Sequence, residues 1–267
     1  CNPTTQENAS ANAPPQPEPV LTLKVSELTT GDAFSSSYDV ASDTVTATLR
    51  GKTYANLPIR ILTEPSSFSL YTDNLNVFVM RKETKNARAR LAALNPLTVS
   101  REKGTGVSLE VLTDGTLPQT GTATFNGDYL GLLGEGDEMR YDKLYAFVSG
   151  KVTLNADLKN ASISGAITER KLATTSSKRE PTYADITLAP ATIGQNGQFK
   201  GTSSKGELIS TTRRVVRAGE GTWSGTFAGP NGEEAVGTVG VGYTVRGISR
   251  GSSNEDYFEQ GIFHATR

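Results

Sequence analysis

The chain has 267 residues, with 27 Lys and Arg against 28 Asp and Glu, so its formal net charge is −1 at pH 7. This balance argues against nucleic acid or an acidic membrane face as a partner of the whole molecule, because both attract an excess of positive charge. A single cysteine excludes a disulfide within the chain, and no apolar run is long enough for a membrane-spanning helix.

The chain begins with its only cysteine, Cys1, and continues in a polar segment rich in Asn, Ala, Thr, Gln and Pro. A first-position cysteine before a flexible tail is what remains when a bacterial lipoprotein signal peptide is cleaved and the new terminus is lipidated. We therefore expect lipidation at Cys1 and a disordered tether over residues 1–19, since so few apolar side chains cannot offset chain entropy. The alternative is a chain cut by chance at a cysteine.

Residues 20–117 contain short alternating segments with long polar connections, which predicts a β-rich domain. The expected strands are Val20–Val25, Val45–Leu49, Ile59–Leu62, Ser67–Tyr71, Val77–Lys82 and Val107–Leu112. One segment favours a short helix or turn instead, because Thr84–Pro96 is rich in Ala and Leu and ends at a proline.

A basic stretch from Arg81 to Arg90 follows the aromatic residues Phe68, Tyr71 and Phe78, which we expect to be exposed. Tyr, Phe and Arg together are typical of interface anchors. Arg81, Arg88 and Tyr71 are therefore candidate partner-binding residues, although a half-buried strand gives the same aromatic spacing.

Residues 118–267 show a tighter pattern, which predicts eight strands. They are Thr122–Leu130, Lys143–Leu154, Ala161–Glu169, Tyr183–Leu188, Gly197–Ser203, Gly221–Phe227, Ala235–Val245 and Tyr257–Ala265. Eight consecutive antiparallel strands close a small up-and-down barrel. The predicted fold class is all-β, with an N-terminal β-rich domain followed by an eight-stranded antiparallel up-and-down β-barrel.

Alternation places Trp223 and Phe227 on one face of their strand, and Ala123 and Phe125 on one face of theirs, so we expect these residues in the core. The pattern leaves open whether the barrel lumen is filled or holds a ligand.

Two long connections of the predicted barrel, Thr168–Thr182 and Ser204–Arg217, are basic and emerge at the same end of an eight-strand meander. We expect them to form a positive rim facing an acidic partner, or else ordinary solvated loops. The candidate residues of this basic rim are Arg170, Lys171, Lys178, Arg179, Arg213, Arg214 and Arg217.

Residues 221–241, GTWSGTFAGPNGEEAVGTVGV, carry a family resemblance, which TGTATFNGDYLGLL (120–133) and the closing GIFHATR support. The matching positions are Gly229, Pro230, Asn231, Glu233, Glu234 and Gly237. This pattern resembles transferrin-binding-protein-B-like surface lipoproteins, a group that includes factor-H-binding protein and haem- or haemoprotein-capturing members. The resemblance covers residues 117–267, and residues 20–117 match the group's handle domain only in position and size.

The resemblance implies a lipid-anchored protein on the outer membrane surface of a Gram-negative bacterium, exported by an outer-membrane lipoprotein translocon. It implies capture of a host macromolecule, either for nutrient acquisition such as iron or haem-protein capture, or for immune evasion. The chain has one lobe where transferrin-binding protein B has two, so transferrin is not fixed as the ligand. The alternatives are a small-ligand carrier, for example of haem, that uses the lumen, and a structural envelope lipoprotein.

We expect neither an enzyme nor a metal site or cofactor. The sole histidine, His264, lies in the terminal strand, and one His and one Cys cannot build a zinc site. No Gly-x-Ser-x-Gly motif occurs. Haem ligands could come from His264, Met80, Met139, Tyr129, Tyr141 or Tyr145, but no pair of them is marked by spacing.

Overall fold

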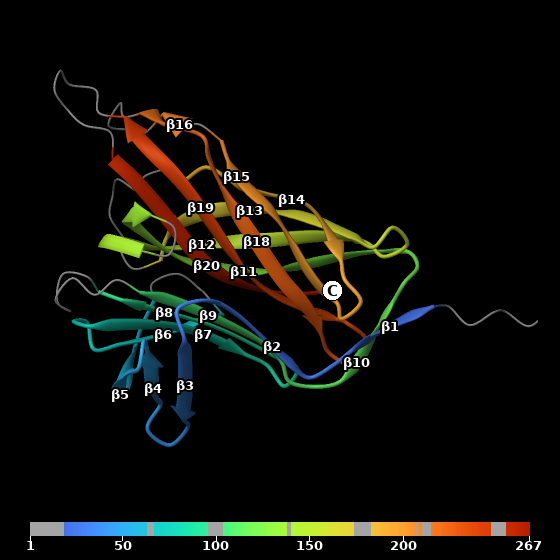
Figure 1. Ribbon diagram of the computed structural model, residues 1–267, viewed down its shortest axis with the longest axis horizontal. Helices are drawn as coiled ribbons and strands as arrows, with labels where there is room; N and C mark the ends of the chain where they lie inside the picture. Colours follow the sequence, from blue (N-terminus) through green and yellow to red (C-terminus); the bar gives the residue numbers. More distant parts are fainter. Residues whose placement is uncertain are drawn as a thin grey trace, which may run out of the picture.

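The computed structural model describes residues 19–62, 67–95, 104–137, 140–173, 183–206, 208–209, 215–246 and 255–267 (Figure 1). These residues form strands and their connections, so the all-β prediction is confirmed. Nowhere in these ranges does the chain form a helix long and apolar enough to cross a membrane.

Eight long antiparallel strands form the barrel: β11 (Thr122–Asp137), β12 (Arg140–Asp157), β13 (Ser162–Leu172), β14 (Ile186–Ile193), β15 (Gln198–Lys205), β18 (Gly219–Ala228), β19 (Glu234–Arg246) and β20 (Glu255–Thr266). Each pairs with the next, and β20 pairs with both β19 and β11, which closes the sheet on itself. Closure leaves no unpaired edge along these strands. Two short strands, β16 (Leu208–Ile209) and β17 (Val215–Val216), extend the sheet beside β19. The prediction of an eight-stranded barrel is confirmed.

Aromatic side chains fill the middle of the barrel. Phe125, Phe199, Trp223 and Phe227 are buried in one core cluster, and their neighbouring ring centroids lie 5.2 to 5.4 Å apart. A Cβ atom added at Gly225 would lie 2.6 Å from the Phe199 ring, so glycine is required for this ring to fit. The expected core positions of Trp223, Phe227, Ala123 and Phe125 are thus confirmed, and this part of the lumen is full.

The N-terminal part forms a second, curled sheet of eight strands in the order β2-β9-β8-β7-β6-β5-β4-β3 (Figure 1). Its strands are β2 (Ser26–Gly31), β3 (Phe34–Asp39), β4 (Thr44–Leu49), β5 (Lys52–Arg60), β6 (Ser69–Thr72), β7 (Val77–Glu83), β8 (Ala87–Leu94) and β9 (Thr105–Val111). One face packs on the barrel, where Phe78 of β7 meets Phe147 of β12 with ring centroids 5.3 Å apart. We call the opposite face the outer face.

The helix predicted over Thr84–Pro96 is wrong, because this segment contains the central strand β8. Ala89 and Leu91 face the barrel, while Ala92 packs with residues of the outer face. Burial on both faces and pairing along both edges outweigh the helix propensity of Ala and Leu.

A two-stranded ribbon, β1 (Val20–Leu23) with β10 (Gly115–Pro118), joins the curled sheet to the barrel. Leu21, Leu23 and Leu117 belong to the barrel core cluster. Figure 1 places the ribbon at the barrel end where the C-terminus lies. The division of the chain between residues 117 and 118 stays a prediction.

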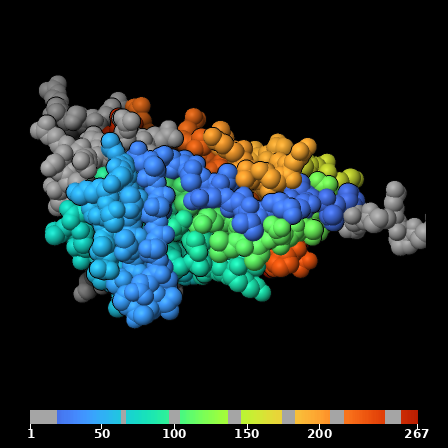
Figure 2. All heavy atoms as spheres, turned by 60° about the horizontal axis from the view of Figure 1, so that its bottom comes forward, coloured from blue at the N-terminus to red at the C-terminus, as the bar shows by residue number. Residues whose placement is uncertain are grey.

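The outside of the molecule also shows how the two sheets meet. Figure 2 shows the blue segment that holds β1 and β2 running beside the orange part of the barrel. A groove of about 560 Å³ lies there, lined by Leu28 to Thr30 of β2 and by barrel residues that include Gln198 and Lys200.

Candidate functional site

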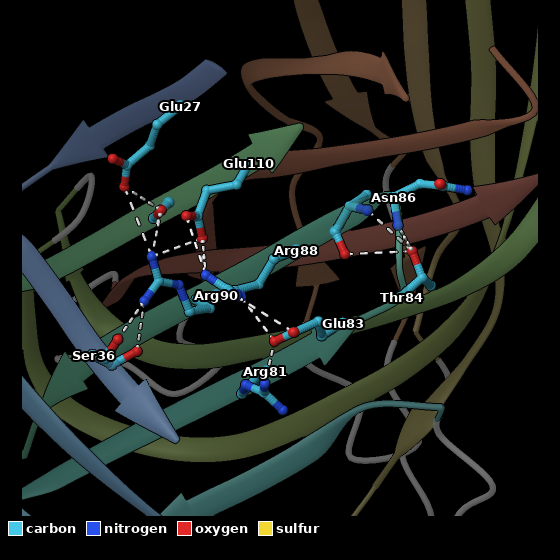
Figure 3. A network of polar contacts seen from close by, with 11 residues as sticks. Glu27, Ser36, Arg81, Glu83, Thr84, Asn86, Arg88, Arg90 and Glu110 are labelled. Carbon is cyan, nitrogen blue, oxygen red and sulfur yellow. Dashed lines mark hydrogen bonds and ion pairs between the residues drawn. The ribbon is translucent and has the colours of Figure 1, made fainter. Parts of the chain in front are cut away.

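Three arginines and three glutamates meet on the outer face of the curled sheet. Because alternate residues of a strand share a face, Arg81 and Glu83 of β7 project to the same side. Arg88 and Arg90 do so on the neighbouring β8. We call the set the arginine network: Arg81, Arg88, Arg90, Glu27, Glu83 and Glu110 (Figure 3).

Arg88 lies between two carboxylates across neighbouring strands. Its Nε is 2.8 Å from Glu83 Oε2 on β7, and its Nη1 is 3.0 Å from Glu110 Oε2 on β9. The Arg88 side chain is 27% exposed, so solvent screens these pairs and their contribution to stability is modest. Their effect is to hold the guanidinium in one orientation at the surface.

Arg90 is the buried member of the network and ties β3 to the sheet. Its Nη1 donates to the carbonyl oxygen and the hydroxyl of Ser36 at 2.9 and 2.8 Å, and its Nη2 lies 2.9 Å from Glu110 Oε2. Burial lowers the pKa of Arg90, and Glu110 opposes this shift. We assign Arg90 a structural role, because both of its terminal nitrogens bond to groups within the chain.

Arg81 stands at the edge of a groove of about 240 Å³ between β3 and strands β7 and β8. Its guanidinium lies 4.3 Å from the centroid of the Tyr38 ring and pairs with Glu83. The groove is lined by Ser36, Ser37, Tyr38, Val40, Arg81, Glu83, Arg88 and Arg90. It presents ordered guanidinium donors and one aromatic ring, a combination common at protein interfaces.

The ionised form of Glu83 is stabilised within this network. Burial alone would raise the pKa of Glu83, but the hydrogen bond from Arg88 and the charges of Arg81 and Arg88 hold that pKa below its ordinary value. Positive and negative groups are balanced, so the surface suits a polar partner with charges of both signs.

Sequence reasoning found Arg81 and Arg88 but missed Arg90 and the three glutamates. The available signal was the pair of alternating motifs, Arg81-x-Glu83 and Arg88-x-Arg90, which predicts a cross-strand charge ladder only if both segments are strands. The helix prediction for β8 hid this pattern.

The aromatic residues expected to be exposed are buried. Tyr71 lies in the core of the outer face, where its hydroxyl donates to Asp43 at 2.9 Å, and burial raises its pKa to about 12. Phe68 and Phe78 pack in the cluster that faces the barrel. Tyr71 is therefore unavailable to a partner, since the β3–β5 strands curl over it.

The basic rim is only partly described. Arg170 does not lie on it, because its side chain is fully buried inside the barrel and pairs with Glu259. Lys171 and Arg217 are exposed, as expected. The remaining candidates, Lys178, Arg179, Arg213 and Arg214, lie outside the described residues.

The Gly-Pro-Asn-Gly motif makes the turn between β18 and β19. Gly229 and Gly232 have φ values of 95° and 63°, the left-handed region that glycine tolerates best. Glu233 Oε2 accepts from the backbone N–H of Asn231 at 2.8 Å. The Pro230 carbonyl accepts from the Thr116 N–H at 3.0 Å, so the turn docks on β10.

Glu234, the second acidic residue of the motif, bridges the barrel and the curled sheet. Its carboxylate accepts from Thr84 Oγ1 at 2.7 Å and Asn86 Nδ2 at 2.6 Å, and it lies 2.8 Å from His264 Nε2. The only histidine is thus held by an internal carboxylate.

The described ranges contain no group of three His, Cys, Asp or Glu side chains that could hold a metal ion. Three of the haem-ligand candidates lie in separate surroundings: Met80 is buried against the barrel, Tyr129 donates to Glu259, and His264 is bonded to Glu234. The side chains of the other candidates, Met139, Tyr141 and Tyr145, lie outside the described residues.

Comparison with known proteins gives a family match over residues 117–267, to the family described as the C-lobe and N-lobe β-barrels of Tf-binding protein B. One similar solved structure is a mutant transferrin binding protein B from Haemophilus parasuis, at 12% identity over 91% of this chain and 45% of that chain, with a TM-score of 0.46. Another is the isotype 1 protein from serogroup B Neisseria meningitidis, at 16% identity over 92% and 43%, with a TM-score of 0.39. The chain spans less than half the length of these structures. No curated protein matches it significantly.

Proposed function

Because the chain belongs to the family of the C-lobe and N-lobe β-barrels of Tf-binding protein B, we propose that it is a binding protein of the cell surface, not an enzyme, and that it captures a host macromolecule. The family match over residues 117–267 is the observation that carries this proposal. Capture would serve nutrient acquisition, such as iron or haem-protein uptake, or immune evasion.

The filled barrel argues against the small-ligand alternative. A carrier needs a lumen cavity of several hundred cubic ångströms. Here Phe125, Phe199, Trp223 and Phe227 occupy the middle of the lumen with rings in contact. Haem would have to displace this core, which is why we favour a macromolecular partner bound on the outside.

We propose two contact surfaces. One is the groove of the arginine network, where Arg81 and Arg88 are 16% and 27% exposed and already oriented by carboxylates. The other is the basic rim, to which the exposed Lys171 and Arg217 contribute. Transferrin is one candidate partner, since the similar solved proteins are named for binding it.

The proposal also includes lipid anchoring at Cys1, display on the outer membrane of a Gram-negative bacterium, and export by a lipoprotein translocon. Metabolic labelling with a clickable fatty acid tests the anchor, because Cys1 is the only cysteine in the sequence. A Cys1→Ser variant should lose both the label and accessibility to protease on intact cells.

The binding experiment uses the full chain without its lipid and couples it to maleimide beads through the free Cys1 thiol, which leaves both proposed surfaces free. Host serum and purified transferrin are applied, and retained proteins are identified by mass spectrometry. We expect one dominant host protein. Retention by a Lys171→Glu/Arg217→Glu variant should fall at least about tenfold, the loss expected when charges at a contact are reversed.

The matched control is Lys159→Glu, an exposed lysine in the turn between β12 and β13, at the opposite end of the barrel from Lys171. Loss of retention with Arg81→Ser instead would assign binding to the arginine network. If no protein is retained above beads coupled to an unrelated protein, macromolecular capture is refuted for these fluids.

A further inference from the structure

One end of the barrel lumen is polar, unlike its aromatic middle. Arg170 of β13, Lys205 of β15 and Glu259 of β20 point into the interior there. Arg170 and Glu259 have fully buried side chains, and Lys205 is 4% exposed. Charged groups buried this deeply are costly unless they are paired.

The carboxylate of Glu259 is already engaged by two donors. Arg170 Nη2 pairs with its Oε2, and the Tyr129 hydroxyl donates to its Oε1 at 2.8 Å. The other terminal nitrogen of Arg170 donates to the Ala184 carbonyl. Arg170 Nε is buried without a hydrogen-bond partner among the described residues.

Lys205 is the unbalanced charge of this group. Its Nζ is buried and makes no hydrogen bond to any residue that the structure describes. It lies 4.4 Å from the centroid of the Tyr243 ring, which stacks on Tyr257 at 5.6 Å. Burial and the charge of Arg170 lower the pKa of Lys205 to about 8, so the ammonium is still largely protonated at pH 7.

Among the described residues at this end, two cations and one carboxylate leave one positive charge uncompensated. Two nitrogens there, Lys205 Nζ and Arg170 Nε, have no hydrogen-bond partner. A carboxylate supplies one negative charge and two oxygens that can each accept from one of these nitrogens, whereas a dianion overshoots the charge. We propose that this end of the barrel lumen binds a small monocarboxylate anion through Lys205 and Arg170.

Thermal unfolding of the full chain tests this site, with Trp223 fluorescence as the signal. Midpoints are compared in sodium formate and in sodium gluconate, whose six-carbon anion is much larger than formate, at equal ionic strength and pH 7. At formate concentrations tenfold above Kd, we expect the midpoint to rise by about 3 °C, since a ligand that binds only the folded state stabilises it.

The decisive variant is Lys205→Met, which removes the charge and keeps an unbranched side chain that is one atom shorter. It should lose the response to formate, and Lys200→Met, an exposed lysine on the same strand, should keep it. Equal midpoints in formate and gluconate for the unsubstituted chain, or a full formate response in Lys205→Met, would overturn the proposal. A response to chloride equal to that to formate would refute the carboxylate assignment.

A calorimetric titration needs no variant and covers the case in which Lys205→Met does not fold. Formate is titrated into the unsubstituted chain at pH 7 and at pH 10. The groups that face Lys205 are Arg170, Glu259 and Tyr243. Arg170 keeps its charge over this range, and burial raises the pKa of Tyr243 well above its ordinary value. Loss of the Lys205 proton should weaken binding at least about tenfold at pH 10, and unchanged affinity contradicts the site.

Discussion

At the residue scale, Glu234 illustrates how one family-motif side chain holds two sheets together. It belongs to β19, but two of its three partners, Thr84 and Asn86, lie in the connection between β7 and β8 of the curled sheet. The Glu234→Gln substitution keeps the size of the side chain but replaces one carboxylate oxygen, an acceptor, with an amide nitrogen, a donor. This donor then faces groups that also donate. We expect the free energy of unfolding at pH 7 to fall by about 1–3 kcal/mol, the range for a buried group left unpaired. Denaturant titration measures it.

The loss in Glu234→Gln should depend on pH. Burial alone would raise the pKa of Glu234, but hydrogen bonds from His264, Thr84 and Asn86 lower it below its ordinary value of 4.5. A carboxylate with a lowered folded-state pKa stabilises the fold above the unfolded pKa, and this contribution disappears as pH falls through the folded value. The difference between the two proteins should therefore shrink below about pH 4. Glu220→Gln, exposed on β18, serves as the control, and a difference independent of pH would contradict the assignment.

At the element scale, the sequence predicted the barrel better than the curled sheet. All eight predicted barrel strands overlap observed ones, because each has one face in a hydrophobic lumen and alternates clearly. The strands of the curled sheet have weaker sequence patterns. β2 and β3 are polar strands such as SELTTG and FSSSYD, and β8 is built from Ala, Leu and Arg. Their burial depends on residues distant in sequence, which no local pattern contains.

The candidate site could likewise be predicted only in part from the sequence. The positive charges of Arg81, Arg88 and Arg170 were visible in the sequence, but their environments were not. Arg81 and Arg88 face a groove, while Arg170 turns into the lumen to meet Glu259, which lies 89 positions away. Which side a basic residue takes near the end of a strand depends on strand length and register.

The β1–β10 ribbon should behave as part of the barrel core, although it belongs to neither large sheet. Leu23 is fully buried in the barrel cluster, and its side chain lies over Gly197. Leu23→Ala should lower the free energy of unfolding by about 2–5 kcal/mol, the usual cost of a cavity at a buried leucine. Val25→Ala, at a position 62% exposed, should change it little. Chemical denaturation followed by Trp223 fluorescence compares the two, and equal effects would contradict the packing.

Some glycines of β19 should tolerate no larger side chain, because neighbouring groups occupy the space that a Cβ atom would need. A Cβ atom at Gly237 would lie 2.2 Å from Phe263 Cζ and 2.5 Å from the Ser224 carbonyl oxygen. Gly237→Ala should therefore destabilise the protein by about 1–3 kcal/mol through overpacking. Gly206→Ala is the matched control, since nothing lies within 4 Å of its added Cβ. The thermal midpoints of the two variants measure the difference, and a neutral Gly237→Ala would show that Phe263 can move aside.

At the scale of the whole molecule, the curled sheet and the barrel share one hydrophobic interface. Residues of β7, β8 and β9 pack against β11, β12, β19 and β20, and the Phe78–Phe147 contact lies within this cluster. Separating the sheets would expose that cluster to water. We therefore expect one cooperative unfolding transition, in which Trp223 fluorescence and far-UV circular dichroism coincide. The fluorescence reports the barrel alone, because Trp223 is the only tryptophan in the sequence and lies inside it.

Phe147→Ala tests this coupling from the barrel side. Removing the ring leaves a cavity against Phe78 and should lower the free energy of unfolding by about 3–5 kcal/mol. If the interface joins the sheets into one unit, both signals move together to lower denaturant. If instead circular dichroism shows an early transition that Trp223 does not follow, the curled sheet unfolds on its own and the interface is only a docking contact. Val40→Ala, at a position 79% exposed on the connection after β3, should leave both signals in place.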